Sequence, residues 1–468
     1  MASVENYQQK IPNIRQRCLF NNSFRFRKDP LSLLSSCCQI DSPLIGIDDG
    51  FYVVVAPELI ELVLHDKHQV FQKSLPDEDR GMVNFASSIM NSSGEDWRRK
   101  RKMLQPGFSR DAVAKGVDAT IEITQGHLDR WQIEPPYSDI RKSLQRLCFD
   151  IGCQFFLKTT LGENEQSAFV ILSDLIIAKT RDGIRFPLGP FDRTEARLAC
   201  ARDAAKELAG AALARARQPR QGSDKSVAWH DGFERSFDKA SDEDDNWLRD
   251  EFCTMILSGL EPMSAGLAWT LHLLTAHPDV LRRVTAEIDA LALTGSDWAT
   301  NGDGPISLDG LNENGLRETR AALKEALRLF PPAWLTGRTV FEDTVLGDFL
   351  LPKGSALMIS PWVNHRSARY FDLPEHYRPD RWLDGTLEER LPRYAFFPFG
   401  GGSRRCIGEH FSMIHMTAIL VCILRRFTLK RMPHTKVRPY PALVLRPLGV
   451  TLTLTPRASE AGLDRTFI

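Results

Sequence analysis

The sequence has no excess of charge of either sign, because 60 lysines and arginines balance 60 aspartates and glutamates over 468 residues. Without a net positive charge, long-range attraction to nucleic acid or to an anionic membrane is not expected. The sequence also has no run of about 18 uninterrupted apolar residues, and its first residues, MASVENYQQKIPNIRQRCLF, are too polar for a signal peptide. We therefore predict a cytoplasmic protein with no nucleic-acid partner and no membrane anchor.

Signals for disulfides, repeats and domain linkers are missing as well. The nine cysteines are an odd number and include no C-x-x-C pair, so reduced thiols are favoured over a disulfide framework. Hydrophobic residues make up 43% of the chain and charged residues 26%, which is typical of a globular protein with a large core. The length would accommodate two or three ordinary domains, but no linker-like stretch divides it.

The patterns that are present are mostly helical. Residues 42–66 read as a strand, an Asp-Asp-Gly turn, a second strand, and a helix that begins at Pro57. Two further helices are expected over residues 166–180 and 194–217, joined by a loop that resembles a lid.

A long apolar helix is expected over residues 246–277. It is apolar on nearly all sides for about 30 residues, so it must cross the centre of the protein. A later helix should end at Pro331 and Pro332, and short strand patterns follow. The sequence therefore predicts a fold that is mainly α with small β-sheets.

The strongest pattern is the stretch FPFGGGSRRCIGEHF, residues 397–411. It has the spacing F-x-x-G-x-R-x-C-x-G, which should recur by chance in about one chain in ten thousand of this size. The alternative, a glycine-rich phosphate loop, lacks both the third glycine of G-x-G-x-x-G and a lysine followed by Ser or Thr. The residues that carry the spacing are Phe399, Gly402, Arg404, Cys406 and Gly408.

With this motif the sequence resembles the cytochrome P450 family, over about residues 29–457. The resemblance implies one P450 domain over residues 29–457, preceded by an N-terminal extension, 1–28, and followed by a tail, 458–468, that we expect to be flexible. It implies haem b between a long distal helix and the helix after the cysteine loop. Cys406 would be the thiolate ligand of the haem iron, with Phe399 beside it and Arg404 at a propionate. N–H groups at the start of that helix would stabilise the thiolate.

Further propionate contacts are implied by a W-x-x-x-R pair. Trp97 and Arg101 are four residues apart, so both side chains fall on one helix face. Taken alone, this basic stretch favours a solvated face or a nucleic-acid patch. By the resemblance, its outward-facing cations would suit docking of an acidic electron-transfer protein. Arg338 resembles another propionate partner, with a surface strand arginine as the alternative.

An E-x-x-R pair precedes the cysteine motif. Glu325 and Arg328 are three residues apart on the expected helix, and the resemblance adds Arg381 to them. An ion pair at this spacing is common and is worth only about 0.2 to 0.5 kcal/mol on a helix surface. We assign these three residues a structural role, in support of the cysteine loop.

The long apolar helix departs from the family pattern at one position. The family has [AG]-G-x-[DE]-T-[TS], and this chain has Ser258 to Met263, with the acid kept as Glu261 and the threonine replaced by Pro262. In the family the threonine hydroxyl handles protons during dioxygen activation. Proline has no such donor, but it leaves the carbonyl of Ser258, four residues back, free to hold a water. Ser258 lies about 40° from residue 262 around the helix, so its hydroxyl is a candidate replacement.

Three functions follow from this departure. We favour a monooxygenase that uses dioxygen and electrons from a separate ferredoxin or flavodoxin-type donor and its reductase. Its missing threonine would be replaced by Ser258, a water or a substrate hydroxyl. The alternative is a haem-thiolate enzyme that uses peroxide or rearranges an oxidised substrate. Peroxide-using members resemble this chain in the proline, but they have an arginine where it has Glu261. A haem-binding sensor without turnover is the third.

The substrate pocket is the least specified part. The family layout implies a small apolar or aromatic metabolite, such as a fatty acid, a terpenoid or an aromatic compound, and a role in secondary metabolism. The chain is expected to be a monomer without a fused reductase. Ordinary core packing is the alternative for every residue expected to line the pocket. These residues are Met82, Phe85, Leu260, Met263, Trp334 and Leu335.

Overall fold

The computed structural model describes most of the chain. The described residues are 11–14, 22–66, 70–73, 85, 87–133, 139–157, 162–185, 194–216, 242–293 and 315–457. Met82, most of the expected lid loop and the expected tail lie outside them.

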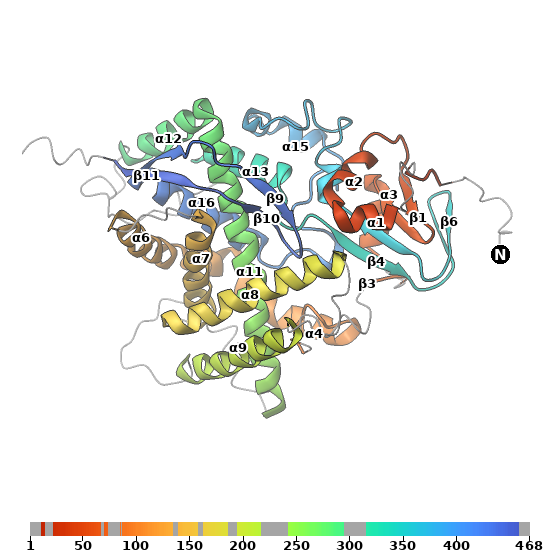
Figure 1. Ribbon diagram of the computed structural model, residues 1–468, viewed down its shortest axis with the longest axis horizontal. Coiled ribbons are helices and arrows are strands. Elements are labelled where there is room, and N and C mark those ends of the chain that lie inside the picture. Colours follow the sequence, from red (N-terminus) through yellow and green to blue (C-terminus); the bar gives the residue numbers. More distant parts are fainter. Residues whose placement is uncertain are drawn as a thin grey trace, which may run out of the picture.

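Helices dominate the fold, as the sequence predicts (Figure 1). The helices are α1 (Asn22–Lys28), α2 (Pro30–Cys37), α3 (Pro57–Leu64), α4 (Gly94–Leu104), α5 (Arg110–Lys115), α6 (Val117–Ile133), α7 (Ile140–Leu157), α8 (Glu163–Arg185), α9 (Thr194–Ala216), α11 (Asp242–Ala276), α12 (Pro278–Leu293), α13 (Arg317–Leu329), α14 (Pro361–Asn364), α15 (Thr386–Arg390) and α16 (Glu409–Arg426). None of these helices is long and apolar enough to cross a membrane.

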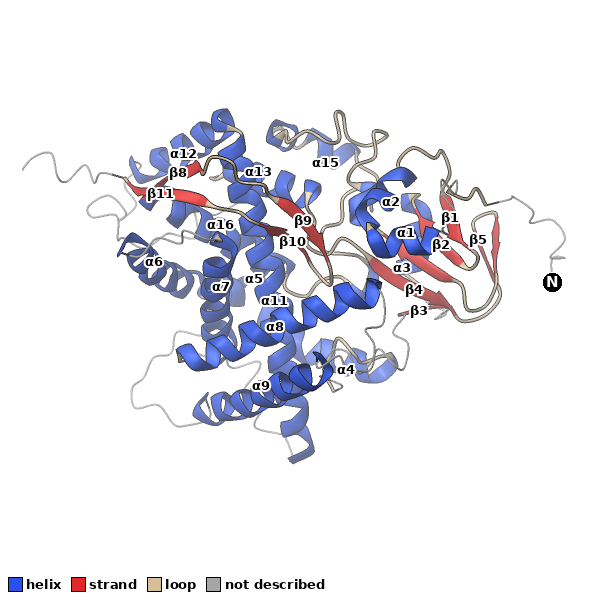
Figure 2. Ribbon diagram, in the orientation of Figure 1, coloured by secondary structure: helices blue, strands red, loops and turns tan. Residues whose placement is uncertain are grey.

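The strands form one sheet of five and three pairs, which Figure 2 shows in red. The five-stranded sheet has the order β1-β2-β7-β4-β3, in which β2 and β7 are parallel and the other neighbours are antiparallel. Its strands are β1 (Leu44–Asp48), β2 (Phe51–Val54), β3 (Phe71–Lys73), β4 (Thr336–Val340) and β7 (Ala356–Ile359). The pairs are β5 (Thr344–Leu346) with β6 (Phe349–Leu351), β8 (Phe427–Arg431) with β11 (Leu452–Pro456), and β9 (Arg438–Pro441) with β10 (Leu445–Leu448).

The fold confirms the predicted class, mainly α with small sheets. The strand–turn–strand–helix reading of residues 42–66 is confirmed by β1, β2 and α3, and the proline pair follows the end of α13. Residues before Asp29 also take part in the fold. The N–H of Ile14 donates to the carbonyl of Gly46 in β1 at 2.9 Å, and the side-chain amide of Asn22 donates to the carbonyl of Ile47 at 2.9 Å.

Helix α11 runs through the middle of the helical part, where Figure 1 shows it in green between α7 and α13. Its apolar side chains are buried against α7, α9 and α13, which explains why the helix has no strongly polar face. Pro262 lies inside this helix, and the helical conformation continues on both sides of it. The helix therefore accepts the lost hydrogen bond because packing on its neighbours holds it in place.

Candidate active site

The loop before α16 is shaped by its glycines. Gly400 and Gly402 have φ angles of 71° and 65°, a region that strongly favours glycine. A Cβ at Gly402 would lie 2.0 Å from the carbonyl oxygen of Leu64, so only glycine allows this approach to α3. The loop then returns on itself, with the N–H of Cys406 donating to the carbonyl of Phe399 at 3.0 Å.

Cys406 lies at the end of this loop. Solvent can reach its side chain, although many atoms of the protein surround it. Burial raises the pKa of the Cys406 thiol, and the nearby Glu409 adds to this effect. The N–H of Gly408 and the charges of Arg101 and Arg405 favour the thiolate and lower the pKa. Since the pKa is raised on balance, the thiol keeps its proton when no metal is bound, and coordination to a metal would remove the proton.

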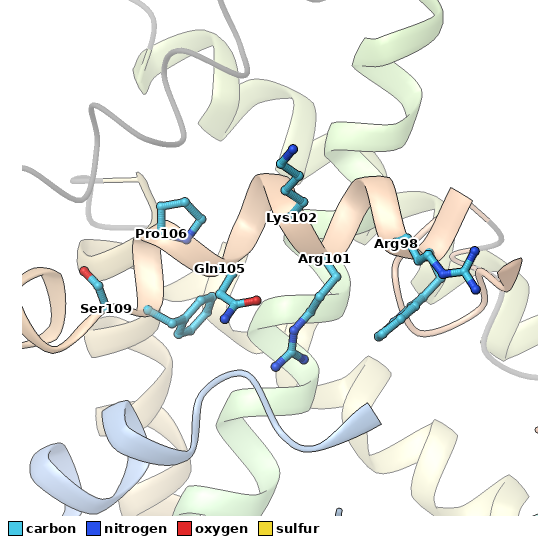
Figure 3. Close-up of a pocket in the computed structure, with 8 residues that line it drawn as sticks. Arg98, Arg101, Lys102, Gln105, Pro106 and Ser109 are labelled. Atoms are coloured by element: carbon cyan, nitrogen blue, oxygen red, sulfur yellow. The ribbon is translucent and has the colours of Figure 1, made fainter. Parts of the chain in front are cut away.

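Three predicted propionate contacts meet beside this loop. The guanidinium carbon of Arg404 lies 4.3 Å from the centre of the Trp97 ring, and Arg101 donates to the carbonyl of Arg405 at 2.9 Å. Trp97 and Arg101 line one cavity of about 600 Å³ together with Gln105 and other residues of this stretch. Figure 3 shows Arg101 reaching from α4 toward the cysteine loop, whereas Lys102 points the other way.

The fourth predicted contact, Arg338, has an unpredicted neighbour of the same charge. Lys73 in β3 is the direct cross-strand partner of Arg338 in β4. Like charges directly opposite each other destabilise a strand pair. Burial, Arg404 and Arg338 lower the pKa of Lys73 to about 8, and burial, Arg338 and Arg101 lower the pKa of Arg404 to about 10.

These cations fit an anionic group with more than one charge. The charges of Arg101 and Arg338 both act on Arg404, and those of Arg338 and Arg404 both act on Lys73, so the four cations lie in one region. The two propionates of a haem are such a group. Among the described residues there is no cluster of three or more His, Cys, Asp or Glu side chains that could hold a metal. The thiol of Cys406 and these cations fit haem, whose iron Cys406 would bind and whose propionates the cations would hold.

The E-x-x-R pair forms a buried network with Arg381. Arg328 makes two hydrogen bonds with the carboxylate of Glu325, at 2.8 and 2.9 Å, and Arg381 donates to the same carboxylate at 3.1 Å. The indole of Trp382 donates to it at 2.8 Å. Arg328 also donates to the carbonyls of three residues, His365, Pro374 and His376. Every oxygen and nitrogen of the ion pair therefore has a partner, as buried charges require.

His365, which the sequence analysis did not single out, connects this network to the cysteine loop. Its Nδ1 lies 3.2 Å from the carbonyl of Arg328, and its Nε2 accepts the N–H of Phe397 at 2.9 Å. This pattern places the proton on Nδ1. Burial and the charge of Arg328 hold the pKa of His365 well below its usual range, so the ring is neutral. In the sequence, His365 is marked only by its position between the E-x-x-R pair and the cysteine motif.

The middle of α11 has an open strip. Within the stretch 251–271, only four residues are not buried: Leu257, Ser258, Gly259 and Pro262. Ser258, Gly259 and Pro262 lie within about 100° of one another around the helix and form the strip, whereas Leu257 lies outside it, about 100° from Ser258. A Cβ at Gly259 would meet no described atom within 4 Å. Ser258 is the most open of the four, and its hydroxyl lies 3.4 Å from the carbonyl of Met255.

Glu261 points away from this strip. Its Oε1 accepts hydrogen bonds from Gln145 in α7 and from Ser173 in α8, and it lies 3.7 Å from Arg141 and 3.8 Å from Arg446. Its Oε2 is buried without a hydrogen-bond partner in the described chain. Burial raises the pKa of Glu261, and the two arginines oppose this effect. The predicted catalytic acid is thus part of a buried network that joins α7, α8, α11 and β10.

An adjacent acid pair in α11 fixes the segment before α4. Asp250 accepts the N–H of Ser87 at 3.1 Å, and Glu251 accepts the N–H of Ile89 at 2.7 Å. Lys206 of α9 pairs with Asp250 at 2.9 Å. On the other side of the segment, Lys100 donates to the carbonyl of Ser87 at 2.6 Å, so this cation of the basic run is not a surface charge.

The predicted pocket residues are mostly in the core. Phe85, Leu260, Trp334 and Met263 are 1%, 2%, 2% and 3% exposed, and Leu335 is half-buried. The indole of Trp334 donates to the carbonyl of Ala442 at 2.7 Å. Leu260 lies about 200° from Ser258 around the helix, on the side opposite the open strip. Leu257, which was not predicted, is half-buried and lies about 60° from Leu260 around the helix.

The comparisons with known proteins agree with this site. The sequence model of the cytochrome P450 family matches residues 45–454. Cyclooctatin synthase of Streptomyces melanosporofaciens is 28% identical over 417 residues, which cover 87% of this chain and 86% of that protein. Cyclooctat-9-en-7-ol 5-monooxygenase of the same organism is 29% identical and covers 82% and 81%. Cytochrome P450 4V2 of Mus musculus is 29% identical and covers 72% and 67%. This chain therefore belongs to the cytochrome P450 family and is a haem-thiolate enzyme of the monooxygenase type.

Proposed function

We propose that this enzyme hydroxylates an apolar carbocyclic metabolite of the terpenoid class, with dioxygen and with electrons from a separate redox protein. The observation that supports this substrate class is the similarity, over more than four fifths of the chain, to two Streptomyces enzymes, cyclooctatin synthase and cyclooctat-9-en-7-ol 5-monooxygenase. The open strip of α11 is consistent with such a substrate, because it presents Gly259 and Pro262 with a single hydroxyl, that of Ser258.

The residues of the cysteine side would hold the cofactor. Cys406 is the proposed thiolate ligand of the haem iron, and Phe399 would pack beside it. Haem bound there supplies the chemistry that activates dioxygen and inserts one of its atoms into a C–H bond. Its propionates would be held by the cations already described and by Trp97. These cations are Lys73, Arg101, Arg338 and Arg404.

The proton path is proposed to run along the open strip of α11. Reduction of dioxygen to an alcohol oxygen and water consumes two electrons and two protons, so a donor must face the reacting site. The hydroxyl of Ser258 is open, and Pro262 leaves the carbonyl of Ser258 without its helical N–H partner, so both can bind a water there. Glu261 would orient α11 through Gln145 and Ser173 instead of transferring the proton itself.

Electrons would come from a ferredoxin or flavodoxin-type protein and its reductase. Arg98, Arg99 and Lys102 on α4 are exposed and would face an acidic partner. Arg98 and Arg99 each pair with an acid of the same helix, Glu95 and Asp96, so part of their charge is already compensated. A monomer that acts in the cytoplasm stays our prediction.

A second candidate is favoured by Pro262 alone. A peroxide-using or rearranging enzyme needs no distal hydroxyl, and proline at this position fits that chemistry. Glu261 argues against this candidate, because the peroxide-using members have at that position an arginine that binds a substrate carboxylate. The two arginines near Glu261 cannot take this role, since Arg141 lies beside Glu261 and Arg446 pairs with Asp174.

The experiment compares oxidants on one purified protein. The reduced protein is first exposed to carbon monoxide, and a thiolate-type absorption spectrum is expected. Cyclooctat-9-en-7-ol, a fatty acid and an aromatic compound are then offered, either with ferredoxin, reductase and NADPH or with hydrogen peroxide alone. Hydroxylation of the carbocycle only with the redox proteins supports the proposal. Turnover with peroxide alone identifies the second candidate, and preference for the fatty acid or the aromatic compound rejects the substrate class.

A further inference from the structure

Tyr394 lies between the cysteine loop and the end of α3. It is buried, and its φ angle of 72° is uncommon for a residue with a side chain. Its hydroxyl oxygen accepts the N–H of Gly402 at 3.1 Å and lies 2.7 Å from Nε2 of His65. The Tyr394 hydroxyl therefore bridges the loop and His65, and the tautomer of His65 decides which group donates in the second hydrogen bond.

The loop is also pressed against the Tyr394 ring. A Cβ at Gly401 would lie 2.1 Å from Cε1 of that ring, and a Cβ at Gly402 would lie 2.0 Å from the carbonyl oxygen of Leu64. The backbone at Gly401 and Gly402 therefore lies between Tyr394 on one side and the last residue of α3 on the other. The left-handed φ of Tyr394 is unfavourable for a residue with a side chain and persists only because the surrounding contacts hold it.

A second contact between the same two segments is weaker. Arg393 pairs with Glu61 of α3 at 2.9 Å, but both side chains are largely exposed, so this pair adds little. Tyr394 also packs edge-on against Phe397, with ring centres 5.8 Å apart. The Tyr394 hydroxyl thus joins the loop, through Gly402, to His65, the residue after α3.

We propose that Tyr394 is a positioning residue for the haem ligand, which holds the cysteine loop against α3 through Gly402, with His65 as its hydrogen-bond partner. Gly402 begins the turn that contains Arg404, and Cys406 follows four residues after Gly402. Fixing the N–H of Gly402 therefore fixes both the proposed thiolate and one proposed propionate cation. The inference rests on Cys406 as the haem ligand.

Tyr394→Phe tests this proposal, because it keeps the ring and removes only the hydroxyl. The haem-loaded variant is reduced under carbon monoxide in increasing urea, and the thiolate-type spectrum is compared with the helical circular dichroism of the same sample. We expect the ratio of thiol-type to thiolate-type complex to be about 5- to 30-fold higher than in the unaltered protein at a urea concentration where the helices are intact.

Tyr377→Phe is the matched control. Tyr377 is also a buried tyrosine whose hydroxyl donates to a backbone carbonyl, that of Ala322 at 3.0 Å. This variant should lose the spectrum and the helices together. The proposal is overturned if Tyr394→Phe behaves in the same way. If the unaltered protein shows no thiolate-type spectrum, the assignment of Cys406 fails as well, so the two failures are distinguishable.

Substitutions at His65 test the partner. His65→Gln keeps a group that can form a hydrogen bond with the Tyr394 hydroxyl, whereas His65→Leu removes it. Because His65 is exposed, both variants should fold. His65→Leu should reproduce the effect of Tyr394→Phe and add nothing to it in the double variant. Equal spectra for the leucine and glutamine variants would remove His65 from the proposal.

Discussion

The cysteine loop and the middle of α11 contribute to one proposed site, but they are held by different means. The loop is held by backbone contacts: glycine angles, N–H groups accepted by Tyr394 and His365, and the buried Glu325 network behind it. The strip on α11 is open, and its nearest acid, Glu261, is turned toward other helices. Substitutions in the cysteine loop would therefore move its backbone, whereas the open positions of α11 can accept other side chains without such a movement.

The largest effect is expected from Cys406→Ser. A serine hydroxyl does not ionise as a thiol does, so the thiolate-type carbon monoxide spectrum and monooxygenation should both be lost completely. Cys422→Ala is the control, because Cys422 is buried in α16 and burial raises the pKa of its thiol to about 12. A thiolate-type spectrum in the Cys406 variant would mean that another residue binds the iron.

The Glu325 network should give the next largest effect. Glu325→Gln leaves the buried charge of Arg328 without its carboxylate, which should lower the free energy of unfolding by about 3 to 5 kcal/mol. The neighbouring Lys324→Gln breaks a more exposed pair with Glu388 and should cost less than about 1 kcal/mol. Urea unfolding of both variants measures the difference. Equal losses would show that the cysteine side does not depend on this network.

Glu251, one of the two adjacent acids of α11, should make the free energy of unfolding depend on pH. Burial raises the pKa of Glu251 from 4.5 to about 7, while the charge of Lys100 opposes the rise and that of Asp250 adds to it. The folded protein therefore keeps a proton that the unfolded chain has lost, so the free energy of unfolding should fall as the pH rises between these two values.

Glu251→Gln removes this titration and keeps an acceptor for the N–H of Ile89. Above pH 7 the variant should be more stable than the unaltered protein by up to about 3 kcal/mol, and the difference should vanish toward pH 4.5. Urea unfolding at several pH values checks this. A difference that does not change with pH would exclude Glu251 as the titrating group.

The smallest effect is expected from Pro262→Thr, because the position is open and the helix is already continuous. A threonine hydroxyl beside Ser258 should raise the fraction of NADPH that yields hydroxylated product by a few-fold, since it adds a second donor. Ser258→Ala should lower this fraction in the unaltered protein and have little effect in the threonine variant. If Ser258→Ala changes nothing in either background, a water or the substrate supplies the proton.

Local spacing explains what could be predicted. The spacing of Glu325 and Arg328 and that of Trp97 and Arg101 fix helix faces, and the glycine–cysteine motif fixes a loop, so these groups were found without the fold. The same geometry could have placed Leu260 on the buried side of α11, because it lies about 200° from Ser258.

The remaining residues depend on contacts between distant segments. Lys73 faces Arg338 only because β3 pairs with β4, and His65 meets Tyr394 across 329 positions of sequence. Glu251 likewise reaches Ile89 from 162 positions away. No local pattern marks such residues, since a lysine in a short strand or a histidine after a helix has many possible surroundings.

The like-charged pair of Lys73 and Arg338 also bears on how the edge strand is held. β3 is an edge strand of three residues, and it meets β4 with two cations face to face. Repulsion there weakens the pairing, and an anion between the cations would offset it. Binding of the haem propionates would therefore also strengthen the attachment of this edge strand to its sheet.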